Sequence, residues 1–80
     1  MNEFIKVITS TREVIDKDKI EIGMRLELFK RYSIDDNWIS IGDGEVVGVF
    51  NDSVEVATPF GYLDMTLDAI KNGFVKFHIK

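Results

Sequence analysis

The stretch that decides the fold reads Glu45-Val46-Val47-Gly48-Val49-Phe50-Asn51-Asp52-Ser53-Val54-Glu55-Val56-Ala57-Thr58. Two runs rich in β-branched residues, 45–50 and 53–58, flank the polar pair Asn51-Asp52. Such runs on either side of two turn-forming residues are typical of a β-hairpin. We therefore predict two antiparallel strands here, and we expect the side chain of Phe50 to point into the core.

Alternation of apolar and polar residues predicts two further strands. Every even position from 20 to 28 is apolar, which indicates a half-buried strand with a bend at Gly23. Near the end of the chain, Val75, Phe77 and Ile79 alternate with polar residues, and we expect Phe77 to point inward. Shorter β-rich runs predict additional strands at 4–8, 12–15, 38–41 and 62–65.

Glycine and proline mark two connections. Gly42-Asp43-Gly44 has the composition of a turn. Thr58-Pro59-Phe60-Gly61 carries proline and glycine at the second and fourth positions, as a type I turn prefers. We therefore expect the chain to reverse direction at both places.

Residues 66–73 allow two local structures. A helical turn over 66–72 would begin with Thr66 as N-cap and place Asp68 in its first turn and Lys71 in its last. Asn72-Gly73 is also a strong signal for a two-residue hairpin. The order of the capping residue and the two charges favours the short helix.

Together these elements predict a mainly β protein. Five or six short strands at spacings of about eight to twelve residues are typical of a small barrel or sandwich. The 80 residues leave no room for a second core, so we expect a single domain over residues 1–80.

The glycine and valine pattern of residues 42–58, with Gly42, Gly44 and the later Val54-Glu55-Val56, resembles the hairpin of SH3-like barrels, including the KOW type. The resemblance implies a five- to six-stranded SH3-like barrel with a short helical turn before its last strand. KOW hairpins usually present basic residues to nucleic acid, whereas this one is acidic. The resemblance therefore bears on the fold and not on the function.

The composition argues against several kinds of active site. There is no cysteine, and the only histidine, His78, alternates with lysines on the predicted last strand, so we expect a surface residue there rather than a catalyst or ligand. Without His78, neither a Cys–His nor a Ser–His–Asp site can be assembled. No acidic stretch continues into a calcium-binding loop. We expect no catalytic residue, no cofactor and no metal. The first residues lack the features of a signal peptide and no apolar run is long enough to span a bilayer, so we expect a cytoplasmic protein that does not contact membranes.

The formal net charge of −4 is distributed unevenly along the chain. Residues 32–70 contain eight carboxylates and no lysine or arginine. Such a stretch suits a basic partner and repels phosphates, although the same charges also keep a small protein in solution. Tyr32 and Trp38 belong to a polar connection after Arg31, and exposed aromatic residues of this kind are typical interface anchors. We therefore expect a non-catalytic binding module whose candidate contacts with a protein partner are Tyr32, Asp35, Asp36, Trp38, Asp43, Glu45, Asp52 and Glu55.

Two alternatives remain open. The lysines Lys71, Lys76 and Lys80, with Arg12, Arg25 and Arg31, would serve a nucleic-acid-binding barrel, although three lysines offer few phosphate contacts. The same lysines could instead protect an edge strand against pairing with another chain. The second alternative is a structural subunit that dimerises through an edge strand. We therefore expect either a monomer or a homodimer. Short acidic chains are often encoded by phages and other mobile elements, which is our expectation for the origin of this one.

Overall fold

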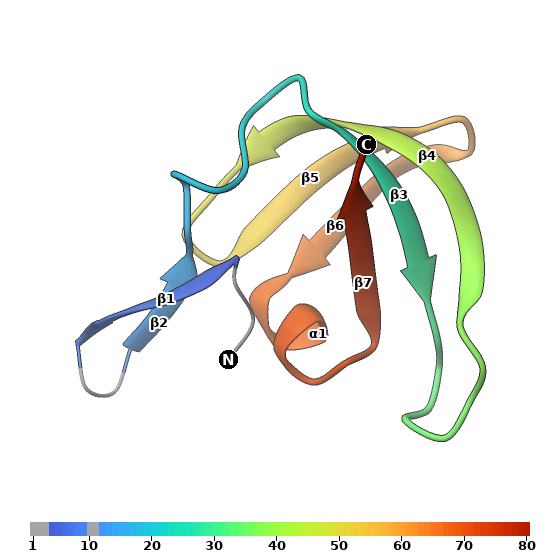
Figure 1. Ribbon diagram of the computed structural model, residues 1–80, viewed down its shortest axis with the longest axis horizontal. Coiled ribbons are helices and arrows are strands. Elements are labelled where there is room, and N and C mark those ends of the chain that lie inside the picture. The colour runs from blue at the N-terminus through green and yellow to red at the C-terminus, as the bar shows by residue number, and fades with distance from the viewer. Residues whose placement is uncertain (1–3, 10–11) are drawn as a thin grey trace.

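The computed structural model describes residues 4–9 and 12–80, and this part of the chain is mainly β, with seven strands and one short helix. A two-stranded sheet contains β1 (Ile5–Thr9) and β2 (Arg12–Ile15). A curved five-stranded antiparallel sheet has the order β6-β5-β4-β3-β7 (Figure 1). Its strands are β3 (Arg25–Lys30), β4 (Ile39–Val49), β5 (Ser53–Thr58), β6 (Gly61–Thr66) and β7 (Val75–Ile79).

The prediction of a closed barrel with five or six strands was wrong. Strands β6 and β7 are the two ends of the larger sheet and do not pair with each other. The chain between them forms the helix α1 (Leu67–Lys71), which contacts the ends of both strands (Figure 1). Among the described residues the larger sheet is therefore open, and the outer edges of β6 and β7 pair with no further strand.

The core lies between one face of the large sheet, the β1–β2 hairpin and α1. The backbone N–H of Ile15 donates to the carbonyl of Asn51 over 2.8 Å, which ties the hairpin to the β4–β5 turn. The ring of Phe4 packs on that of Phe77, with 4.6 Å between centroids. The buried cluster consists of Ile5, Ile15, Ile20, Leu26, Leu28, Val46, Val54, Val56, Met65, Ile70 and Phe77. The inward orientation of Phe77 is thus confirmed.

The β4–β5 hairpin is confirmed, but the expected orientation of Phe50 was wrong. The register shifts at Val47, because Val46 pairs with Val56 whereas Gly48 pairs with Glu55. One extra residue on β4 exchanges the faces of all residues that follow it. Phe50 is consequently 50% exposed, and its ring covers the place where Gly48 lacks a side chain.

Two predictions about the preceding segments also need correction. Gly42-Asp43-Gly44 is not a turn but part of β4, and Gly42, with φ of +99°, sits at a β-bulge opposite β3. The strand expected from residue 20 begins only at Arg25, although Ile20 is buried. The predicted bend at Gly23 is confirmed, with φ of +96°, and its backbone N–H donates to the carbonyl of Val46.

The short helix was the correct choice for residues 66–73. The Oγ1 atom of Thr66 accepts the backbone N–H of Ala69 over 3.1 Å, as expected for an N-cap. Asp68 lies in the first turn and Lys71 in the last. Within the described residues, no helix has the length and apolar character needed to cross a membrane.

Candidate functional site

The outer face of β5 and β6, opposite the core, carries carboxylates. Side chains alternate between the two faces of a strand, and the buried Val54 and Met65 define the inner face. On the outer face, Glu55 lies directly opposite Asp64 in the ladder. Two like charges in this position repel each other and destabilise the pairing slightly, so they are not explained by sheet stability.

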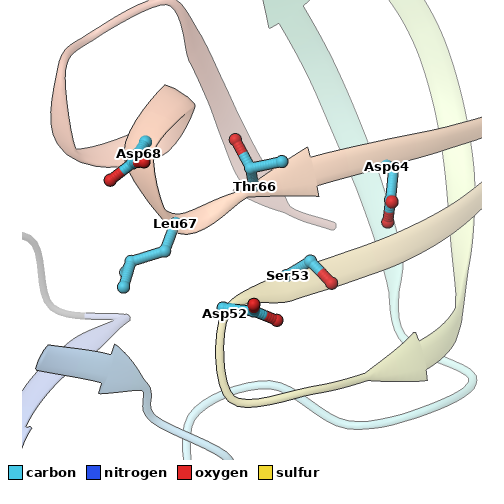
Figure 2. A pocket seen from close by; sticks show the side chains of 6 residues that line it. All are labelled: Asp52, Ser53, Asp64, Thr66, Leu67 and Asp68. Atoms are coloured by element: carbon cyan, nitrogen blue, oxygen red, sulfur yellow. The ribbon is translucent and has the colours of Figure 1, made fainter.

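A pocket of about 410 Å³ lies at one end of this face. Figure 2 shows its six lining side chains, which come from the turn before β5 and from β5, β6 and the start of α1. The backbone N–H of Leu67 donates to the carbonyl of Asp52 over 2.7 Å and so fixes the turn against the helix. The lining residues are Asp52, Ser53, Asp64, Thr66, Leu67 and Asp68.

We call Asp52, Glu55, Asp64 and Asp68 the acidic surface. None of these four takes part in an ion pair with another described residue. The carboxylates Glu13, Asp16, Asp43 and Glu45 do have such partners. The negative charge of the acidic surface is therefore not neutralised by an ion pair among the described residues.

Lys71, the positively charged residue closest in sequence to the acidic surface, does not neutralise it. Lys71 lies on the same helix as Asp68, but its ammonium group forms an ion pair with Glu13. The hydrogen bond and the charge of Glu13 raise the pKa of Lys71 above its usual 10.5, with a smaller contribution from the charge of Asp68. In the part of the chain that the structure describes, no group of three or more His, Cys, Asp or Glu side chains could hold a metal ion.

Exposed aromatic side chains lie on the same β5–β6 hairpin as the acidic surface. Phe60, at the β5–β6 turn, is 86% exposed, and Tyr62, on the outer face of β6, is 77% exposed. Large exposed aromatic side chains next to charges are common in contact surfaces between proteins. Neither residue is among the contacts predicted from the sequence. Asp64 and Asp68 belong to the acidic stretch 32–70 but are not among the predicted contacts either. The alternation of Tyr62, Asp64 and Thr66 with inward residues was the signal that could have identified the first part of this set.

The predicted contact residues fall into three separate places. Asp52 and Glu55 belong to the acidic surface. Asp43 and Glu45 lie on β4 and are paired, Asp43 with Lys80 at 2.5 Å and Glu45 with Arg25 at 3.9 Å. The exposed Asp35 and Asp36 lie in the connection between β3 and β4.

Known proteins do not identify this site. No known protein family, curated protein or solved structure matches this chain. The resemblance of residues 42–58 to SH3-like barrels gains no support from these comparisons. The function is therefore inferred from the side chains themselves.

Tyr32 and Trp38 lie among cations rather than among carboxylates. Trp38 is half-buried, with the guanidinium of Arg31 at 4.1 Å and the Nζ atom of Lys76 at 4.6 Å from its ring centroid. Tyr32 is exposed, and the Nζ atom of Lys30 lies 5.1 Å from its ring centroid. The contact between Trp38 and Lys76 thus links the β3–β4 connection to β7.

The three lysines of the nucleic-acid alternative also have internal contacts. Lys71 pairs with Glu13 and Lys80 with Asp43, while Lys76 lies over aromatic rings. Two of the three positive charges are therefore partly neutralised where they stand. The position of β7 at the edge of the sheet agrees with the expectation that its lysines protect an edge strand.

Proposed function

We propose that this chain is a non-catalytic binding module whose acidic surface contacts a basic segment of a protein partner. The observation that carries the proposal is a pocket lined by three carboxylates without internal ion pairs, Asp52, Asp64 and Asp68, with a fourth, Glu55, opposite Asp64 in the ladder. The carboxylates of the neighbouring β4 strand are, by contrast, paired within the molecule. Lysine or arginine side chains are the groups that such a surface attracts.

The surrounding residues support a protein rather than a small molecule as the partner. Tyr62 lies on the outer face of β6, two residues from Asp64, and the exposed Phe60 lies in the β5–β6 turn at the end of β6 away from the pocket. Aromatic residues supply binding energy, while complementary charges steer the encounter and fix the orientation. The non-catalytic part of the proposal rests on composition, since the single imidazole, His78, lies against the ring of Phe29 on β3 and lines no part of the pocket.

The test compares neutralised variants of equal charge. Immobilised wild-type protein, the double variant Asp64→Asn/Asp68→Asn and the control Asp18→Asn/Glu21→Gln are exposed to a lysate of the source cells. The control residues are exposed and lie before β3, outside the pocket. Bound proteins are identified by mass spectrometry, and the affinity of each is then measured with purified protein.

We expect the Asp64→Asn/Asp68→Asn variant to lose partners that the control retains. Two exposed ion pairs of about 0.5–1 kcal/mol each correspond to roughly a five- to thirtyfold loss of affinity. The partners that are lost should carry a basic segment. Equal affinities for both variants would show that the acidic surface does not bind the partner.

A further inference from the structure

The open sheet leaves the two terminal strands with very different free edges. A free edge presents unpaired N–H and C=O groups to any extended chain, and lysines are a common protection against such pairing. Strand β7 carries Lys76 between its ends and Lys80 directly after it. Strand β6 contains no lysine, arginine or proline, and its outward side chains are those of Tyr62, Asp64 and Thr66. The edge of β6 is thus the unprotected one.

The ladder between β5 and β6 shows which backbone groups are available. It runs without a bulge from the pair Ser53–Thr66 to the pair Thr58–Gly61. The hydrogen bond from Leu67 N–H to the Asp52 carbonyl sets the alternation, because every second pair in an antiparallel ladder exchanges hydrogen bonds. The N–H and C=O groups of Tyr62 and Asp64 consequently point away from β5. No backbone group elsewhere in residues 4–9 and 12–80 bonds to them.

We propose that the free edge of β6 binds an extended, basic segment of the partner protein as an added antiparallel strand. This inference rests on the proposed function and specifies how the partner is held. All ladders of the sheet are antiparallel, and an added strand in this direction forms the same hydrogen bonds.

The direction determines which residues of the partner must be basic. In an antiparallel pair, residues that exchange hydrogen bonds lie opposite each other and share a face. Partner residues opposite Tyr62 and Asp64 therefore project onto the outer face, beside the acidic surface. A lysine opposite Asp64 lies beside a residue that itself lines the pocket. The alternate residues of the added strand face the same side as Leu63 and the core.

Charge also argues against a second copy of β6 as the occupant. Antiparallel self-pairing of two β6 edges brings the two Asp64 side chains onto one face near each other. Like charges at such positions destabilise strand pairing. A basic segment places opposite charges there instead.

The probe is an eight-residue peptide that alternates lysine with valine and is blocked at both ends. Two isomers carry backbone N-methyl groups either on the lysines or on the valines, so that charge and mass are equal. Affinities for the unmodified wild-type protein are measured by isothermal titration calorimetry at low salt. Because the change is made in the peptide, the fold of the protein is not perturbed.

We expect the valine-methylated peptide to bind like the parent peptide and the lysine-methylated peptide to bind at least about fivefold more weakly. Each lost hydrogen bond contributes about 0.5–1.5 kcal/mol, and two or more are removed. Equal binding of the two isomers, or selective loss with the valine-methylated peptide, would overturn the antiparallel strand. A mass that rises with protein concentration in light scattering, without peptide, would show a second copy on this edge and would overturn it too.

The proposed function is judged separately in the same titrations. The parent peptide is also titrated into the Asp64→Asn/Asp68→Asn variant and the Asp18→Asn/Glu21→Gln control. One possible result is weaker binding of the parent peptide to the Asp64→Asn/Asp68→Asn variant only, with equal binding of the two methylated isomers to the wild type. This result refutes strand addition and leaves the acidic surface as the contact. Equal binding of the parent peptide to both variants refutes the acidic surface itself and, with it, the strand addition that rests on it.

Discussion

Replacing Gly44 by alanine tests the packing between β4 and its neighbours. Gly44 is buried in β4, opposite Leu26 of β3. An added Cβ atom would overlap the Cγ1 atom of Val56 and would lie 3.0 Å from Cδ1 of Leu28 and 3.1 Å from the carbonyl of Ala57. The Ala57 carbonyl belongs to the backbone of β5, so the new methyl group has to displace the Val56 side chain.

Two opposing effects determine how much Gly44→Ala changes the free energy of unfolding. Alanine in place of glycine within a strand gains about 0.5–1 kcal/mol from backbone entropy. Overpacking of a closed core costs about 1–3 kcal/mol. We therefore expect Gly44→Ala to lower the free energy of unfolding by about 1–2 kcal/mol. Val56→Ala, which removes two fully buried methyl groups, should cost roughly 2 kcal/mol by itself.

The double variant Gly44→Ala/Val56→Ala separates overlap from a general loss of stability. The space vacated by Val56 receives the new methyl group, so the double variant should lose only about 2 kcal/mol rather than the sum of the two single losses. Urea unfolding measures these differences, with the fluorescence of the single Trp38 and circular dichroism as independent signals. Strict additivity, or a Gly44→Ala variant at least as stable as the wild type, would refute the packing argument.

Two other contacts yield predictions of the same kind. Because Glu13 raises the pKa of Lys71 above 10.5, the stabilisation by this pair is complete below that pH and is lost as the pH rises through the raised pKa. The urea midpoint of the wild type should fall in this alkaline range more than that of Glu13→Gln, and parallel curves would contradict the assignment. Arg31→Met should lower the free energy of unfolding by about 1–3 kcal/mol in urea titrations, since the Arg31 Nε atom donates to the Gly73 carbonyl over 2.7 Å and the guanidinium lies over Trp38. An unchanged midpoint for Arg31→Met would show that these contacts do not stabilise the fold.

Elements whose determinants lie within a few residues were predicted correctly from the sequence. The β4–β5 hairpin has its turn signal in Asn51-Asp52, between two β-branched runs. The helix α1 has its N-cap and both favourable charges within six residues. Such signals act locally and need no knowledge of the strand pairing.

Errors occurred where the structure depends on strands that meet only after folding. Gly42 and Gly44 have the composition of a turn, yet β4 continues through them because they pair with Leu28 and Leu26 of β3. The orientation of Phe50 depends on the bulge at Val47, which exchanges the faces of the residues after it. Neither effect leaves a periodic signal in the sequence.

The residues of the candidate site could also be predicted only in part from the sequence. The stretch without lysine or arginine drew attention to Asp52 and Glu55, which lie on the acidic surface, but it also included Asp43, whose charge is partly neutralised by Lys80. That pairing arises because β7 lies beside β3 in the sheet, far from its position in the sequence. Asp64 joins the acidic surface through its register with Glu55, which alternation alone does not reveal.

The pairing of β7 with β3 also bears on the order in which the chain folds. Strands β3, β4, β5 and β6 pair with their neighbours in sequence, whereas Leu26 of β3 meets Ile79 of β7 only after the whole intervening segment has been looped out. Closing a long loop costs entropy before any contact repays it. The β3–β6 meander should therefore form first. The arrival of β7, which brings Phe77 against Phe4, should then complete the core in one cooperative step.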